Sequence, residues 1–136
     1  MYAKVDADVL RELRTIAGER HVLTDPQALE PYTHDETVGL QATPEVVVRV
    51  ASTEEVSQVL RLANERRIPV TPRAGGQGLS GGAVPVLGGI VLSLERMDRI
   101  IEIDRENLTV TAQPGVITGN LHRAVEEEGL LYPPDP

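Results

Sequence analysis

The chain has 136 residues, a formal net charge of -8, 40% hydrophobic residues and no cysteine. This length fits one domain with a real core. The negative charge argues against nucleic acid or an anionic membrane surface as a partner. The lack of cysteine excludes disulfides and thiolate metal sites. No apolar run approaches the roughly 20 residues of a membrane span, and no signal-peptide pattern is visible, so we expect a cytoplasmic protein with no transmembrane segment.

The first 44 residues predict a helix followed by a shorter helix and a loop. Five apolar residues recur at helical spacing: Val9, Leu10, Leu13, Ile16 and Ala17. Gly18 is placed to end that helix. Thr24 with Gln27 matches a capping box, which predicts a short helix over residues 26–30. The polar residues 33–44 predict a loop.

A strand, a helix and a second strand are predicted next. Residues 46–50 are rich in β-branched side chains, which favours a strand. Ser52 with Glu55 is a second capping box, so we expect a helix that runs to about Arg66. Residues 68–71 predict a short strand. Because a crossover helix joins parallel strands, these two strands should be parallel.

A glycine-rich stretch, PRAGGQGLSGGAVP, occupies residues 72–85 at the carboxyl end of that second strand. Open α/β sheets bind ligands at this end of their strands. Gly76, Gly78 and Gly81 match G-x-G-x-x-G, but glycines and prolines fill the span where the helix of a dinucleotide fold would begin. Two readings remain open at this point: a nest of backbone N–H groups that binds a diphosphate, or a wide turn between strands.

Three more strands and a helix are expected after the glycine stretch. The strands are predicted at residues 90–94, 99–104 and 108–113, with a turn at residues 105–107 between the last two. Thr118 is placed to cap a helix that ends at Gly129.

Histidine and acidic residues do not suggest a metal site or a catalytic group. His21, His34 and His122 are far apart and lack metal-ligand spacing. The run His34, Asp35 and Glu36 is interpreted as a solvated loop rather than a metal ligand set. We therefore predict no metal and no catalytic residue in this chain.

Several segments together resemble the FAD-binding domain of the vanillyl-alcohol oxidase superfamily, also called the PCMH-type FAD-binding domain. They are PRAGGQGLSGGAVP, IVLSL, ERMDRIIEID, TVTAQPGV and LYPPDP, in this order. Within the superfamily, the chain is most similar to the flavin subunit of glycolate oxidase and to FAD-linked D-lactate dehydrogenases.

The resemblance implies a set of FAD contacts, made mostly by backbone atoms, because the glycine loop of this family wraps the FAD diphosphate. The implied residues are Arg73, Ala74, Gly75, Gly76, Gln77, Gly78, Leu79, Ser80, Gly81, Gly82, Pro114, Gly115, Pro133, Pro134 and Asp135. The family usually has Gly where Ala74 stands and often Thr where Gln77 stands. Some members link FAD covalently to a histidine at the position of Gln77, so the resemblance implies non-covalent FAD here.

The implied fold class is α+β, the amino-terminal part of a PCMH-type FAD-binding domain. A βαβ unit with a glycine-rich diphosphate loop would be followed by the start of a second α+β subdomain. We expect residues 1–44 to form a leading helix and loop, residues 45–104 the first subdomain, and residues 105–136 the start of the second. The substrate domain of the family would be absent.

The implied function is that of the FAD-binding portion of a flavoprotein dehydrogenase or oxidase of 2-hydroxy acids, with glycolate or D-lactate converted to the 2-oxo acid. Candidate partners are the 2-hydroxy acid, an iron–sulfur electron-acceptor subunit and further copies in a homo-oligomer, and this chain alone is expected to be inactive. Two alternatives stay open: a flavin-binding module with no activity of its own, or a non-flavin protein that binds another nucleotide diphosphate.

Overall fold

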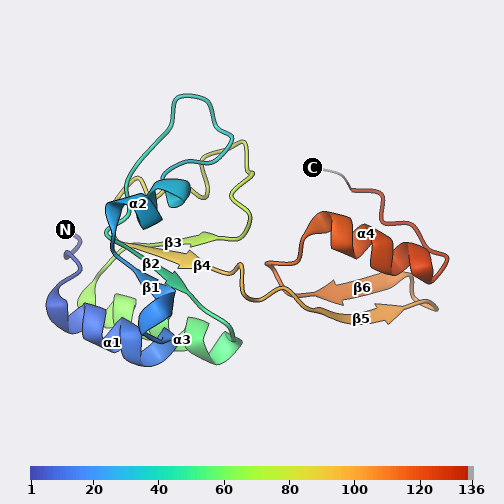
Figure 1. Cartoon of the computed structure of the whole chain (residues 1–136), viewed down its shortest axis with the longest axis horizontal. Coiled ribbons are helices and arrows are strands. Elements are labelled where there is room, and N and C mark those ends of the chain that lie inside the picture. Colours follow the sequence, from blue (N-terminus) through green and yellow to red (C-terminus); the bar gives the residue numbers. More distant parts are fainter. Residues whose placement is uncertain (135–136) are drawn as a thin grey trace.

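Four short strands form a mixed sheet in the first lobe of the molecule, in the order β1-β2-β4-β3. They are β1 (Val22–Leu23), β2 (Val46–Arg49), β3 (Val70–Arg73) and β4 (Ile90–Ser93). β2, β4 and β3 run parallel to one another, and β1 pairs antiparallel with β2. The structure is a computed structural model and describes residues 1–134 (Figure 1).

Helices lie on both faces of this sheet (Figure 1). Their bounds are α1 (Ala7–Ala17), η1 (Glu19–His21), α2 (Pro26–Leu29), η2 (Glu30–Tyr32) and α3 (Thr53–Arg66), where η marks a short 3-10 helix. α1 and α3 share one face, and α2 with η2 covers the other.

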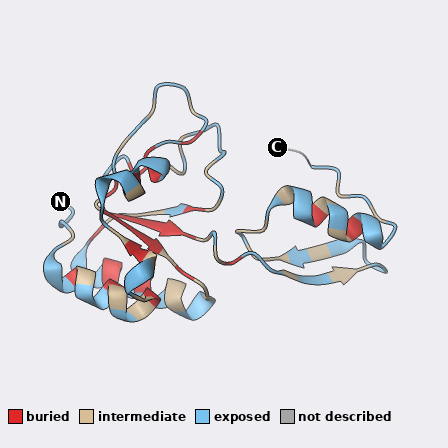
Figure 2. Cartoon of the chain, viewed as in Figure 1, coloured by how far each residue is buried: buried red, intermediate tan, exposed pale blue. Residues whose placement is uncertain are grey.

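The side chains of β2 alternate between these two covered faces, because successive residues of a strand point to opposite sides. Val46 and Val48 pack in the cluster that α1 and α3 complete, whereas Val47 packs with Leu29 and Tyr32 on the other face. Figure 2 shows that buried residues concentrate in these central strands. A continuous β-branched run is typical of a parallel strand that is buried on both faces.

The second lobe is a β-hairpin with one helix packed against it. Its elements are β5 (Ile100–Asp104), β6 (Thr109–Ala112) and α4 (Thr118–Glu127). The Asp104 carboxylate closes the hairpin turn by accepting hydrogen bonds from the backbone N–H groups of Glu106 and Asn107, at 3.0 and 2.9 Å. The two strands and the turn predicted for residues 99–113 are therefore present. Residues 99–104 were expected in the first subdomain, but β5 pairs with β6 in the second lobe.

The structure shows two features of strand pairing that the sequence did not predict. β2 and β3 are parallel as predicted, but β4 lies between them, so they are not neighbours. The two-residue strand β1 was not predicted at all, since two residues are too few to show a period. The second strand of the βαβ unit also begins two residues later than expected and includes Arg73.

Two helix caps were predicted at the wrong residues. α2 is capped by Asp25, whose carboxylate accepts a hydrogen bond from Gln27 N at 2.9 Å, and not by Thr24. Ile117 stands at the N-cap of α4 and Thr118 is the first helical residue, so no side-chain oxygen caps this helix.

The mixed helix and sheet content confirms the predicted α+β class. None of the helices found in residues 1–134 has the length and apolar character needed to span a bilayer.

Candidate functional site

A groove of ≈ 620 Å³ separates the glycine loop from the segment that leads into α4. The loop begins directly after Arg73, at the carboxyl end of β3, and faces the second lobe. The groove is lined by residues of both segments: Gly75, Gly76, Gln77, Gly78, Pro114, Gly115, Val116, Ile117, Thr118 and Gly119. None of these side chains is charged, although the chain as a whole carries a net charge of -8.

The amino end of α4 forms one side of this groove. Thr118 and Gly119, its first two residues, line the groove, and no side chain caps the helix. The first N–H groups of a helix have no partner within it, and they carry a partial positive charge. An uncapped helix end opposite a glycine loop therefore offers backbone donors from two sides, which suits a phosphate group.

Two glycines of the groove are fixed by their close surroundings. Gly76 has φ +70°, and a Cβ atom there would overlap the guanidinium of Arg73. A Cβ atom at Gly115 would overlap the carbonyl oxygen of Leu94. Gly75 differs from both, because a Cβ atom there would meet nothing within 4 Å. The space beside Gly75 is thus open to a ligand.

Arg73 is buried and serves the backbone rather than the groove. Its Nη1 donates to His34 O at 2.6 Å and to Ala83 O at 3.4 Å, and its Nη2 donates to Pro31 O at 2.9 Å. The guanidinium also lies 5.7 Å from the centre of the Tyr32 ring. Arg73 therefore joins the glycine loop to the segment around residue 32, and both of its terminal nitrogens donate to carbonyl oxygens.

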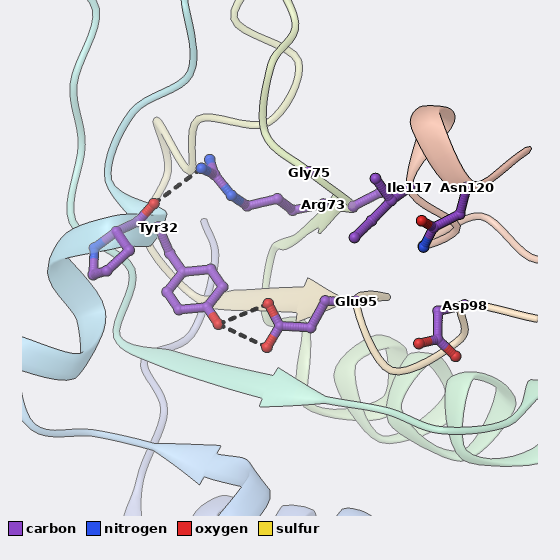
Figure 3. Close-up of a pocket in the computed structure, with 10 residues that line it drawn as sticks. Tyr32, Arg73, Gly75, Glu95, Asp98, Ile117 and Asn120 are labelled. Carbon is purple, nitrogen blue, oxygen red and sulfur yellow. Dashed lines mark hydrogen bonds between the residues drawn. The ribbon is translucent and has the colours of Figure 1, made fainter. Parts of the chain in front are cut away.

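A second cleft of ≈ 330 Å³ adjoins the groove and has an acidic wall (Figure 3). The Tyr32 hydroxyl donates to both carboxylate oxygens of Glu95, at 3.0 and 3.1 Å, and Arg49 lies 3.5 Å from the same carboxylate. Burial, together with the charge and hydrogen bond of Glu95, raises the pKa of Tyr32. Asp98 lines this cleft as well. Carboxylates accept hydrogen bonds and carry negative charge. This cleft therefore suits ligand groups that donate hydrogen bonds better than it suits phosphates.

Asp35 corrects the interpretation of residues 34–36 as a solvated loop. His34 and Glu36 are exposed, but Asp35 is only 6% exposed and lies behind the glycine loop. The Thr37 backbone N–H donates to its Oδ1 at 2.9 Å and is the main reason that the pKa of Asp35 is lowered.

The structure divides the predicted FAD contacts into four groups. Six line the groove: Gly75, Gly76, Gln77, Gly78, Pro114 and Gly115. Arg73 and Ala74 line the adjoining cleft, together with Gly75 and Gly115. Leu79, Ser80, Gly81 and Gly82 line neither cavity, so their role rests on the resemblance alone.

The last group follows α4. Pro133 and Pro134 lie outside both cavities, and Asp135 lies outside the described residues. His122 contacts this segment, with Nε2 at 3.1 Å from Pro134 O and its ring centre 5.5 Å from that of Tyr132. Contact of each of these residues with FAD stays a prediction.

Nine residues that line the two cavities were not predicted from the sequence. They are Val116, Ile117, Thr118 and Gly119 in the groove, and Pro31, Tyr32, Glu95, Asp98 and Asn120 in the adjoining cleft. The Pro-Gly pair just before a predicted helix was the available signal for the first four. The others come from three separate segments, and only the folded chain brings them together.

Known proteins resemble this chain in sequence and in fold. A family model described as an FAD binding domain matches residues 44–136. The chain is 45% identical over 136 residues to D-lactate dehydrogenase of Anaerostipes hadrus, a match that covers 99% of this chain and 28% of that protein. It is 42% identical over 132 residues to glycolate oxidase subunit GlcD of Bacillus subtilis, with 97% and 28% covered.

A crystal structure of p-cresol methylhydroxylase has a similar fold, with a TM-score of 0.79 and 30% identity. This match covers 89% of the present chain and 24% of that chain. The chain thus spans 28% of the length of the two curated relatives named above. The matched family model and the similar fold, together with a groove that has no charged lining residue, lead to one conclusion: the chain belongs to the FAD-binding domain family.

Proposed function

We propose that the groove holds the diphosphate of non-covalently bound FAD and that the whole protein is a dehydrogenase or oxidase of a 2-hydroxy acid such as glycolate or D-lactate. The observation that carries the first part is the neutral groove between residues 75–78 and residues 116–119. The relatives named D-lactate dehydrogenase and glycolate oxidase subunit GlcD support the second part.

The residues of this chain bind and orient the cofactor, and the cofactor supplies the redox chemistry. When bound, FAD would supply the oxidation step, in which two electrons and a hydrogen leave the carbinol carbon of a hydroxy acid for the flavin. The backbone N–H groups of the glycine loop and of the amino end of α4 neutralise the diphosphate. The adjoining cleft, with Glu95 and Asp98, accepts hydrogen bonds from the hydroxyl or amino groups of the same ligand.

The same relatives support a proposal for the partners of the whole protein. One relative is named as a subunit, which supports a multi-component enzyme. An electron-acceptor subunit that carries an iron–sulfur cluster would take electrons from the reduced flavin. A homo-oligomer and a cytoplasmic location complete the proposal.

The absorption spectrum of the purified whole protein tests the cofactor part. We expect a yellow protein whose flavin is released into the supernatant when the protein is precipitated with acid. A colourless protein that binds added ADP but not FAD would instead identify a non-flavin nucleotide-binding protein. Colour that stays with the pellet would contradict non-covalent binding.

Turnover tests the second part separately. We expect glycolate or D-lactate to bleach the bound flavin under anaerobic conditions, and an artificial electron acceptor to restore its colour. A yellow protein whose flavin no 2-hydroxy acid reduces would be a flavin-binding module without this activity.

A further inference from the structure

The segment from residue 31 to residue 42 lies against the glycine loop on the side away from the groove. The Glu36 N–H donates to Gly78 O at 3.0 Å, and Arg73 donates to the carbonyl oxygens of Pro31 and His34. A Cβ atom at Gly81 would lie 2.5 Å from Leu40 Cδ2, so the two segments are also packed closely. We call residues 31–42 the bracing segment.

The glycine loop has few backbone bonds of its own near the groove. Among the described residues, Gly78 O is the one backbone atom of residues 74–80 that hydrogen-bonds to another segment, and its partner belongs to the bracing segment. The next backbone bond along the loop joins Val84 N to Gly81 O. The shape of the loop therefore depends on contacts from outside it.

Asp35 is the buried charge between the bracing segment and the loop. Its Oδ1 accepts the Thr37 N–H within the bracing segment, at 2.9 Å. Its Oδ2 is buried, has no hydrogen-bond partner of good geometry, and lies 3.7 Å from the position of a Cβ atom at Gly78. Burying a carboxylate oxygen without a full partner is costly, so such an atom calls for an explanation.

The surroundings of Asp35 supply that explanation. The amide and hydroxyl of Thr37, within the bracing segment, favour the charged form most, and the Ala83 amide of the glycine loop and the Arg73 guanidinium of β3 add to this effect on the pKa. One carboxylate oxygen holds the turn of the bracing segment, and the other lies beside Gly78 of the loop. We infer that Asp35 is a positioning residue that holds the glycine loop in its binding shape without touching the cofactor, a role that rests on the proposed FAD site.

The decisive variant is Asp35→Asn in the whole protein. The amide oxygen of Asn keeps the Thr37 bond, but the charge that faces the loop is lost. We expect FAD to bind about tenfold more weakly, which corresponds to about 1.4 kcal/mol. In the protein freed of FAD, hydrogen exchange should quicken at the amides of residues 78–83 and stay unchanged at residues 35–37.

Glu36→Gln is the matched control, because it removes the same charge from the neighbouring exposed residue and leaves the backbone bond to Gly78 in place. This variant should bind FAD with wild-type affinity, and its amide hydrogens should exchange at wild-type rates. If Asp35→Asn showed wild-type hydrogen exchange at residues 78–83, the inference would be overturned. Asp35 would then act only in the turn at Thr37, because Asn keeps the bond to Thr37. Failure of the wild type to bind FAD would overturn the proposed function instead, and the exchange comparison would still decide the role of Asp35.

Discussion

Individual residues of the glycine loop have different tasks, although the sequence presents them as one run. Gly76 makes room for the guanidinium of Arg73, and Gly75 leaves open space beside the groove. Arg73 itself, the one charged residue of the stretch, is buried against carbonyl oxygens. Glycine density predicts that backbone groups bind the ligand, but it could not show which glycines line the groove.

Gly75→Val tests the groove at the scale of one side chain. The added side chain meets no protein atom within 4 Å of its Cβ, so the fold should be kept while the ligand space is filled. We expect the affinity for FAD to fall more than about tenfold, or about 1.4 kcal/mol, in a calorimetric titration of the whole protein.

Gly82→Val is the comparison, since a Cβ atom there is equally free and Gly82 lines neither cavity. It should retain most of the affinity. Equal loss in both variants would mean that the ligand contacts the whole loop rather than the groove described above.

Arg73→Met tests the structural role of the buried guanidinium. The variant leaves the Pro31 and His34 carbonyl oxygens without their donor, so the free energy of unfolding should fall by about 3 kcal/mol. Urea unfolding measures this loss, and Arg61→Met, at an exposed position of α3, should be close to neutral. A stable Arg73→Met variant that merely loses FAD would show that Arg73 acts on the ligand.

At the scale of elements, the sequence predicted helices and their ends best where a pattern extends over several neighbouring residues. Ser52 was predicted to cap α3, and its hydroxyl does accept the Glu55 N–H at 3.2 Å. The cap of α2 was misassigned because Thr24 and Asp25 are adjacent and either can cap. The position of β4 between β2 and β3 could not be read from the chain, since local patterns do not carry strand order.

Ser52→Ala tests the cap of α3. Loss of a capping hydroxyl typically costs about 1 kcal/mol, and α3 forms one wall of the main core, so the unfolding midpoint in urea should decrease accordingly. Thr53→Ala, at the next and exposed position, should change stability by only a few tenths of that amount. Equal losses of stability in the two variants would contradict a stabilising role for the Ser52 cap.

At the scale of the whole molecule, the two cavities lie where the lobes meet, and they combine segments that are distant in sequence. The resemblance to a known family predicted the loop and the Pro114-Gly115 pair, but not the acidic wall formed by Glu95 and Asp98. Polar composition suggested that Asp35 is solvated, and only the packing of two loops buries it. Such contacts between loops have no sequence period that could reveal them.

Glu45 links the amino terminus to the rest of the fold and makes stability depend on pH. Burial opposes its ionisation, but the Val5 amide at 2.7 Å and the Lys4 ammonium at 3.0 Å help to lower its pKa below the ordinary 4.5. A lowered pKa in the folded state stabilises the fold above the unfolded pKa, and this contribution is lost as the pH falls through the folded value.

We therefore expect the stability difference between the wild type and Glu45→Gln to be constant from about pH 6 to 7 and to shrink below about pH 4.5. Urea unfolding across this range measures it. Glu65→Gln, at an exposed position of α3, should show no such dependence. A difference that grows on acidification would contradict the lowered pKa of Glu45.

The most direct test of the FAD site compares hydrogen exchange of the whole protein with FAD, with riboflavin and without ligand. Riboflavin has the same ring system but no diphosphate. If the diphosphate lies between the glycine loop and α4, FAD should slow exchange at residues 75–78 and at residues 116–119 together, and riboflavin should protect neither segment. Protection by FAD at neither segment, or equal protection by riboflavin, would contradict a diphosphate site between these two segments.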